Sequence, residues 1–350
     1  MPSVYDRLDQ NKSPDTQVIE TSEEFQRAVA EIRASGKGVS LGIGGGGAYG
    51  EASYQIILKL LSLWIEPEQY IGNSAGAIIA TLLSLGYRDP KYVDFFLSGL
   101  DKNIAFKDIP LVLISKLIPF VYEFPKEHKV LQERLFQENN SFLQYIKNIS
   151  LKELSIDGEL STEAIEKVVC GFFSMPTKKL SLHKITFNDV KDWGFGKRET
   201  GEWVNLRIIT WAITDIATST KRGIRRDIKV NNGIVRSIQF RGSYPIFDAI
   251  FASACPWIPK KTTIKRGQFI LTDGYMATQN FPNRDEHFKG WTTSVVIHTD
   301  DDFILTKLVL PDYGDIDYVI RPDMRTGDAF GASPEARKFV QDRAAKIIGY

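Results

Sequence analysis

The sequence has few cysteines and almost no net charge, and both shortages narrow the range of functions. Cys170 and Cys255 are the only cysteines among 350 residues, so neither a disulfide framework nor a cysteine-rich zinc site is available. The 44 Lys and Arg residues almost balance the 43 Asp and Glu residues, for a formal net charge of +1. A dedicated nucleic-acid-binding protein would show a clear basic excess. We therefore expect no nucleic-acid partner.

Long hydrophobic runs are also missing. The longest nearly apolar segment, IPLVLISKLIPFV, covers residues 109–121 and is shorter than the ~20 residues that a membrane-spanning helix needs. The first 17 residues are polar and turn acidic at residue 6, unlike a secretory signal peptide. We expect a protein that is soluble as made and cytoplasmic. Secretion by a non-classical route is the open alternative.

Helix signals occur near both ends of the chain and before Pro67. Thr21 or Ser22 is expected to cap a helix that Gly36 ends, and Ser333 is expected to cap the last helix. Apolar residues at helical spacing predict an amphipathic helix before Pro67. Its predicted apolar residues are Ile56, Ile57, Leu60, Leu61 and Trp64.

Strand patterns alternate with these helices. Buried strands are expected at 37–43, 204–214, 269–272 and 294–299, and a hairpin is expected to turn at Asn232-Gly233. Apolar strands that alternate with helices are typical of a parallel sheet covered on both faces. The predicted fold class is therefore α/β, a three-layer sandwich with a mostly parallel central sheet flanked by helices.

Nothing in the composition marks a linker between two large domains. We expect an N-terminal arm and helix over residues 1–35, followed by a single domain over 36–350. Residues 89 to about 200 mix helical patterns with aromatics and loops. We therefore expect a cap or lid, inserted into the domain at about 100–200.

The segment GNSAG, residues 72–76, matches the GxSxG pattern between a predicted strand and a predicted helix. A nucleophile on a strained strand-to-helix turn needs neighbours without side chains, here Gly72 and Gly76, so that the Ser74 hydroxyl stands clear. The helix N-terminus also places partial positive charge near a developing oxyanion. The alternative is a serine that only caps the helix.

A second glycine cluster, GIGGGGAYG, covers residues 42–50 and supports two interpretations. Gly42, Gly44 and Gly47 satisfy the dinucleotide pattern GxGxxG, with Glu66 roughly where a ribose-binding acid is expected. Alternatively, the loop amides form an oxyanion hole for Ser74. Only the oxyanion hole uses both glycine motifs together.

An Asp-Gly pair, Asp273 and Gly274, follows a predicted strand in LTDGYMATQNFP, residues 271–282. On its own, a strand-end Asp-Gly is more often a turn. The surrounding motifs make Asp273 a candidate catalytic residue.

Taken together, five ordered segments resemble the patatin-like phospholipase family. The glycine loop, with Gly45, Gly46 and Gly47, resembles the family's oxyanion loop, and GNSAGAIIATLLSLGY resembles its serine elbow. The other segments are KITFNDV with LRIITWAITDIAT, FASACPWIP (251–259), and LTDGYMATQNFP. The resemblance covers about residues 38–300. The chain departs from it at Tyr49, where many members carry Arg or Lys.

The resemblance implies a patatin-like serine carboxylic-ester hydrolase of phospholipase A or lysophospholipase type. Asp273 would accept the Ser74 proton directly, and water would resolve the acyl-enzyme. No metal or other cofactor is implied. The implied partner is membrane phospholipid at the bilayer surface, where the enzyme would act peripherally, and an activating ligand or protein is a further candidate.

Three alternatives to the dyad enzyme stay open. An α/β-hydrolase triad would need a histidine after Asp273, and His287 and His298 are the candidates. The other two are a non-catalytic binding module and a nucleotide-binding oxidoreductase. Segment 109–121 is either a lid that opens on lipid or a core helix, and KRGIRR, residues 221–226, is either a headgroup contact or a solvated hairpin tip.

Overall fold

The fold is taken from a computed structural model. It describes residues 12–84, 88, 186–188, 205–213, 224–226, 235–240, 243, 245–253, 264–266, 269–272, 292–299, 316–324 and 333–350. Several sequence predictions fall outside these residues and are not tested by the fold: the two cysteines, segment 109–121, nearly all of the expected cap, Asp273 and His287.

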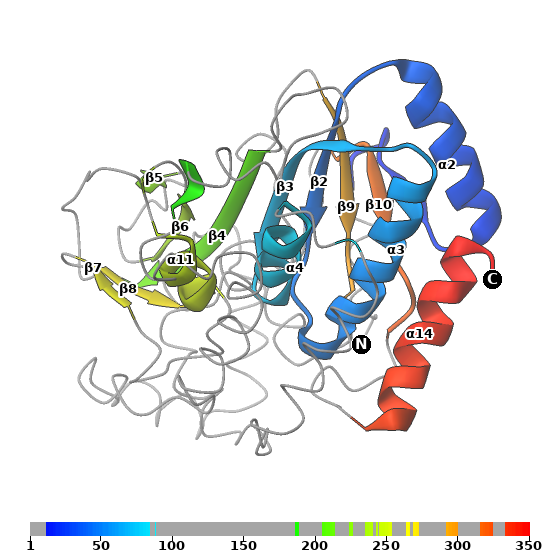
Figure 1. Cartoon of the computed structure of the whole chain (residues 1–350). Coiled ribbons are helices and arrows are strands. Elements are labelled where there is room, and N and C mark those ends of the chain that lie inside the picture. Colours follow the sequence, from blue (N-terminus) through cyan, green and yellow to red (C-terminus); the bar gives the residue numbers. More distant parts are fainter. Residues whose placement is uncertain are drawn as a thin grey trace, which may run out of the picture.

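Six adjacent strands form the parallel part of one open sheet, in the order β1-β10-β9-β2-β3-β4 (Figure 1). Their bounds are Gln17–Ile19 (β1), Tyr318–Ile320 (β10), Thr293–Ile297 (β9), Val39–Ile43 (β2), Pro67–Asn73 (β3) and Asn205–Ile213 (β4). Every residue of β2 and of β9 is buried, as expected for central strands covered on both faces. The predicted mostly parallel sheet is confirmed.

The sheet continues beyond β4 with antiparallel strands: Val235–Phe240 (β6), Ile224–Arg226 (β5), Ile264–Arg266 (β7) and Phe269–Thr272 (β8). Strand β5 pairs with β6 antiparallel, with Ile224 opposite Phe240 and Arg226 opposite Ile238. The predicted turn at Asn232-Gly233 lies outside the described residues. The expectation that 221–226 is only a solvated tip is wrong for Ile224–Arg226. The hairpin is longer than predicted, and this segment forms its outer strand.

Strand β4 determines where the ends of β3 and β8 lie. Strand β6 lies along one edge of β4, where it pairs with residues 208–213. Strand β3 pairs with residues 205–209 of β4. Because both strands pair with residues 208 and 209, β3 must lie along the opposite edge. Strand β8 pairs with residues 211–213 of β4, which also pair with β6, so β8 lies along the same edge of β4 as β3. The two strands run toward each other, since Asn73 pairs with Ile209 and Thr272 with Trp211. Their carboxyl ends thus face each other along one edge of β4.

Helices flank the sheet (Figure 1). Helices α3 (Gly50–Ser62) and α4 (Ala75–Ser84) follow β2 and β3, and α4 packs on β3. Helix α11 (Ile246–Ser253) packs on β4 and α4, and α14 (Pro334–Ile348) packs on α3 and on α2 (Ser22–Ser35). All ten residues of α4 are buried, which explains why its sequence is apolar around its whole circumference.

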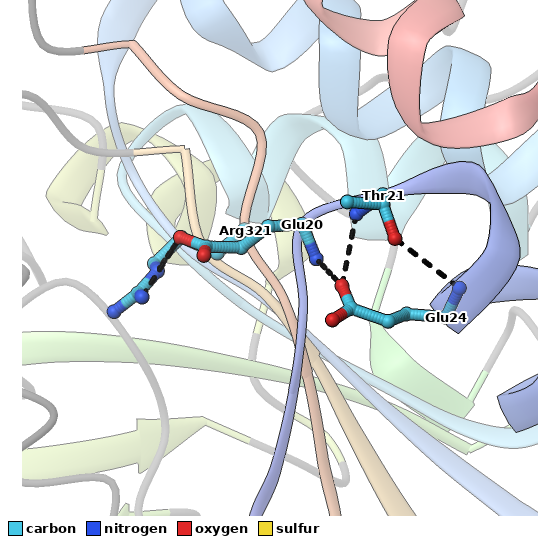
Figure 2. Close-up of polar contacts among 4 residues, drawn as sticks. All are labelled: Glu20, Thr21, Glu24 and Arg321. Atoms are coloured by element: carbon cyan, nitrogen blue, oxygen red, sulfur yellow. Dashed lines mark hydrogen bonds and ion pairs between the residues drawn. The ribbon is translucent and has the colours of Figure 1, made fainter.

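The N-terminus of α2 is fixed by a capping box (Figure 2). The Thr21 hydroxyl accepts from the Glu24 amide at 3.3 Å, and the Glu24 carboxylate accepts from the amides of Thr21 and Glu20 at 3.0 and 2.8 Å. The Glu20 amide is the main cause of a lowered Glu24 pKa. Beside the box, the nearly buried Arg321 pairs with Glu20 at 2.8 Å. The predicted cap and the predicted stop at Gly36 are confirmed.

The helix before β3 ends earlier than its apolar pattern indicates. Helix α3 stops at Ser62, and Trp64 has a φ of +63° and is 73% exposed. Trp64 lies past the last helical turn, in the short connection to Pro67, so helical spacing no longer directs its side chain to the core. The prediction that Trp64 belongs to the buried stripe is wrong, whereas Ile56, Ile57 and Leu60 are buried.

None of the helices in the described ranges is both long and apolar enough to cross a membrane. Parallel strands with flanking helices agree with the predicted α/β fold class, and the open sheet is consistent with the three-layer architecture.

Candidate functional site

Ser74 lies in the tight turn between β3 and α4, with a φ of +53°. This left-handed conformation is strained for a residue with a side chain, and it is typical of a serine elbow. Ser74 is partly exposed, although its neighbours Asn73 and Ala75 are buried. Its carbonyl accepts from the Ala77 amide at 2.9 Å, so the turn leads directly into α4.

Both elbow glycines are required by space. A Cβ on Gly72 would collide with the carbonyl oxygen of Gly76, and one on Gly76 would collide with the carbonyl oxygen of Ile43. These contacts are with backbone atoms, which cannot rotate away. The sequence-based reason for the GxSxG glycines was an unobstructed hydroxyl, and close backbone packing is a second reason.

The elbow is also held from α11. The Ser253 hydroxyl accepts a hydrogen bond from the Ser74 backbone amide at 3.0 Å, and Ser253 is fully buried. Ser253 lies in the segment FASACPWIP, but no local pattern in that segment identifies this serine. Only the packing of α11 on α4 brings it to the elbow.

The glycine loop connects β2 to a 3-10 turn, Gly47–Tyr49 (η1), that leads into α3. Gly46 and Gly47 have φ angles of +118° and +56°, which favour glycine. Gly45 is buried, whereas Gly46 and Gly47 are partly exposed. Within the described part of the chain, the amides of Gly45 and Gly46 have no hydrogen-bond acceptor. The oxyanion-hole interpretation requires unbonded backbone amides of this kind.

The loop and the elbow are in contact. The Gly76 Cα lies against the carbonyls of Ile43 and Gly44, where the loop begins. A Cβ on Gly50, at the start of α3, would lie 3.7 Å from the Ala75 Cβ. Both ends of the glycine loop that contains Gly45, Gly46 and Gly47 thus lie against the elbow that contains Gly72, Ser74 and Gly76.

Asp273 lies outside the described residues, but the strand that precedes it does not. Strand β8 ends at Thr272, whose partner Trp211 is two positions along β4 from Ile209, the partner of Asn73. Two strand residues span roughly 6.6 Å. The residues that directly precede Ser74 and Asp273 are therefore neighbours along one edge of β4.

The geometry does not favour the dinucleotide interpretation. Glu66 precedes β3 and so lies at the amino ends of the parallel strands, whereas the glycine loop lies at their carboxyl ends. Glu66 pairs with Arg88 at 2.7 Å. A ribose-binding acid would have to follow the carboxyl end of a strand next to the loop. Strand β3 presents Ser74 there instead.

Two further sequence candidates are buried. Tyr49 is completely buried, and its hydroxyl donates to the Met324 carbonyl at 3.5 Å. At the position where the resemblance leads one to expect Arg or Lys, this chain therefore has a core residue. His298 directly follows β9 and is fully buried, as expected for a packed side chain.

Among the described residues, no group of three or more His, Cys, Asp or Glu side chains could hold a metal ion.

Thr299, two residues beyond the end of β9, is a residue that the sequence did not suggest. Thr299 is fully buried, and its hydroxyl donates to the Gly45 carbonyl at 3.1 Å. The strand order β9-β2 would have been needed to find it from the sequence.

Comparisons with known proteins place this geometry in a family. No curated protein matches the chain. Among solved structures, VipD from Legionella pneumophila is similar with a TM-score of 0.37 and 16% identity, over 75% of this chain and 50% of that one. The chain thus spans half the length of that structure. The family model for patatin-like phospholipases matches residues 41–284, more than half of the chain. The chain therefore belongs to the patatin-like phospholipase family, whose members act on lipid esters.

Proposed function

We propose that this chain is a phospholipase of the A or lysophospholipase type that uses Ser74 as nucleophile and Asp273 as general base. The observation that carries the proposal is Ser74 itself. It is held in a left-handed turn at the start of α4, beside a glycine loop whose amides are available to a ligand. A serine that only caps a helix has an extended backbone and needs no second glycine loop.

The reaction follows from this arrangement. The Ser74 Oγ attacks the ester carbonyl carbon while its proton passes to the Asp273 carboxylate, and the carbonyl oxygen takes up the negative charge. Amides of Gly45, Gly46 and Gly47 donate to that oxyanion, which typically contributes a few kcal/mol. Collapse expels the alcohol, which takes the proton from Asp273, and leaves an acyl-enzyme. Water then attacks the acyl-enzyme by the same route and releases the fatty acid.

The strand pairing supports the assignment of Asp273. Its covalent neighbour Thr272 ends β8 on the edge of β4 that also carries the end of β3. The base and the nucleophile would thus approach each other from opposite directions. A triad histidine is unnecessary in this scheme, and His298, the described candidate, is buried next to β9 and not beside β8.

The setting of the reaction is also part of the proposal. Phospholipid is assembled in bilayers, so the enzyme would work peripherally at the membrane surface, from the cytoplasmic side. Residues at about 100–200, inserted between α4 and β4, would form the cap over the site. An activating ligand or protein would act through that cap.

The proposal predicts selective labelling of Ser74 by a fluorophosphonate. Intact mass after incubation with the probe, with phosphatidylcholine vesicles present, should show one adduct on the wild type and none on Ser74→Ala. Asp273→Asn should remain folded, yet release fatty acid from the vesicles at a rate lower by at least about a thousandfold, as for other general bases that act directly on the nucleophile.

His287→Ala and His298→Ala are the controls, and both should be labelled if they remain folded. A wild-type protein that takes no label and releases no fatty acid with vesicles present would contradict the proposal. Loss of labelling in folded His287→Ala would instead favour a triad.

A further inference from the structure

We infer that Thr299 is a positioning residue for the oxyanion loop, and that its hydroxyl group, supported by Ser53, fixes the direction of the Gly46 amide. The inference rests on the proposed function and names a part of the site that lies outside the residues resembling the family's motifs. It concerns alignment of a donor, because the Thr299 side chain contacts the back of the loop and not the substrate.

The contacts form a directed chain of hydrogen bonds. The Ser53 hydroxyl, on α3, donates to the Thr299 Oγ1 at 3.4 Å, and the Thr299 hydroxyl donates to the Gly45 carbonyl at 3.1 Å. All of these groups are buried. In a buried setting a hydroxyl that accepts from one partner and donates to another has a defined orientation.

The planar peptide transmits this orientation. The Gly45 carbonyl and the Gly46 amide belong to one trans peptide unit and point in opposite directions. Since Thr299 holds the carbonyl oxygen on the buried side, the Gly46 N–H points to the other side. Gly45 is buried and Gly46 is partly exposed, in agreement with a peptide whose oxygen faces inward and whose N–H faces outward.

The Thr299 backbone limits the loop as well. A Cβ on Gly46 would lie 2.7 Å from the Thr299 carbonyl oxygen and 3.2 Å from its Oγ1. Two residues before Gly46, the Gly44 amide donates to the Ile297 carbonyl at 3.1 Å, which continues the β2–β9 pairing. The end of β9 thus holds the loop through a backbone bond at Gly44 and a side-chain bond at Gly45.

A glycine-rich loop needs such fixed points. Glycine gains more conformational freedom on release than any other residue, so unsupported amides would sample many directions. An oxyanion hole accelerates the reaction only if its donors are aligned before the charge develops. The Thr299 hydroxyl provides this alignment from the core, where no solvent competes for the carbonyl.

The test compares two substitutions that separate the hydroxyl from the methyl group. Thr299→Val keeps the volume and loses the hydroxyl, whereas Thr299→Ser keeps the hydroxyl and loses the methyl. With a soluble short-chain ester and the full-length chain, we expect Thr299→Val to lower kcat by about ten- to a hundredfold, with KM changed less than about threefold. Removing an oxyanion donor outright costs about a hundred- to a thousandfold. Thr299→Ser should stay within about threefold of the wild type.

Ser53→Ala provides an independent variant that leaves Thr299 in place. It should lower kcat by about three- to tenfold, and it should have no further effect in the Thr299→Val background, because Ser53 acts through Thr299. Fluorophosphonate labelling rates should fall in the same order. Tm values measured for each variant establish that the folded state is retained.

The outcomes distinguish this inference from the proposed function. Wild-type kcat in folded Thr299→Val, or equal losses in Thr299→Val and Thr299→Ser, would overturn the inference alone, since the wild type would still label at Ser74. If Thr299→Val does not fold, an unchanged kcat in Ser53→Ala overturns the inference. A wild type that neither labels nor turns over would overturn the proposed function and this inference with it.

Discussion

At the scale of single residues, the candidate site depends on neighbouring residues that hold the backbone of Ser74 rather than on Ser74 alone. A left-handed serine persists only where its surroundings fix it. Three such supports are visible: close packing at Gly72, close packing at Gly76, and the hydrogen bond from the Ser74 amide to Ser253. The last of these can be removed without adding any atom.

Ser253→Ala should slow fluorophosphonate labelling while Ser74 remains present. The substitution leaves the amide of Ser74 without its Ser253 acceptor, which typically costs about 1–3 kcal/mol for a buried donor. Part of that cost should destabilise the left-handed turn at Ser74. Because the turn positions the Ser74 hydroxyl, the labelling rate should fall. Urea unfolding and the labelling rate should be measured together.

Ser84→Ala is the matched control, because it removes another buried hydroxyl, one that bonds to the Thr81 carbonyl within α4. It should lower the free energy of unfolding to a similar degree and leave the labelling rate unchanged. Equal labelling rates in Ser253→Ala and Ser84→Ala would show that Ser253 has no particular role at the elbow.

At the scale of elements, helix ends are where sequence and structure agree best. The caps of α2 and α14 and the stop at Gly36 are predicted because each depends on contacts between residues three or four positions apart. Trp64 could not be placed in the same way. Its conformation depends on how the chain turns from α3 into β3, and helical spacing carries no information on where a helix ends.

The capping box of α2 predicts a pH dependence of stability. The hydrogen bond from the Glu20 amide holds the pKa of Glu24 below its ordinary 4.5. Its ionised form is therefore favoured by folding, so this contribution is complete above pH 4.5 and is lost as pH falls through the lowered folded pKa. Glu24→Gln should lower the free energy of unfolding by under about 1 kcal/mol at pH 7, since the carboxylate is partly exposed and solvent screens its interactions.

The difference between wild type and Glu24→Gln should then shrink at acid pH, as followed by thermal unfolding at several pH values. Glu23→Gln removes a charge from the same first turn and serves as the control. A difference that stays constant from neutral to acid pH would contradict this account of Glu24.

At the scale of the whole molecule, the two ends of the parallel strands carry different features. The carboxyl ends of β2 and β3 carry the glycine loop and Ser74, whereas the connection before β3 carries the exposed Trp64. Changes at Trp64 should therefore affect stability and not the site. A substitution of Trp64 therefore tests whether the candidate site at the carboxyl ends of the strands is independent of the structure at their amino ends.

Trp64→Gly should raise the free energy of unfolding by roughly 0.5–1 kcal/mol. A left-handed conformation costs a residue with a Cβ about 1–2 kcal/mol, and the flexibility of glycine in the unfolded chain offsets about half of that gain. The labelling rate of Ser74 should not change. Trp64→Ala retains the strain and should be nearly neutral. Destabilisation by Trp64→Gly, measured by urea unfolding, would show that the ring makes contacts that outweigh the strain.

The sequence predicts the parallel sheet and the residues of the elbow and loop, because both leave local patterns of apolar runs and glycines. It does not predict which strands become neighbours. The position of Thr299 behind Gly45 depends on the pairing of β9 with β2, and the position of Thr272 depends on β8 joining the edge of β4 that β3 also occupies. Those pairings involve residues far apart in the chain, where no periodicity connects them.

The meeting of β3 and β8 along β4 has a consequence for biosynthesis. A ribosome completes the nucleophile's strand early, but β8 is made much later and β9, which supports the loop, later still. If the proposed function is correct, Ser74 would have neither its base nor an aligned oxyanion hole until those strands emerge and dock. We therefore expect a copy that ends before β8 to have no lipid-hydrolase activity, so the activity would arise only after nearly the whole chain has been made.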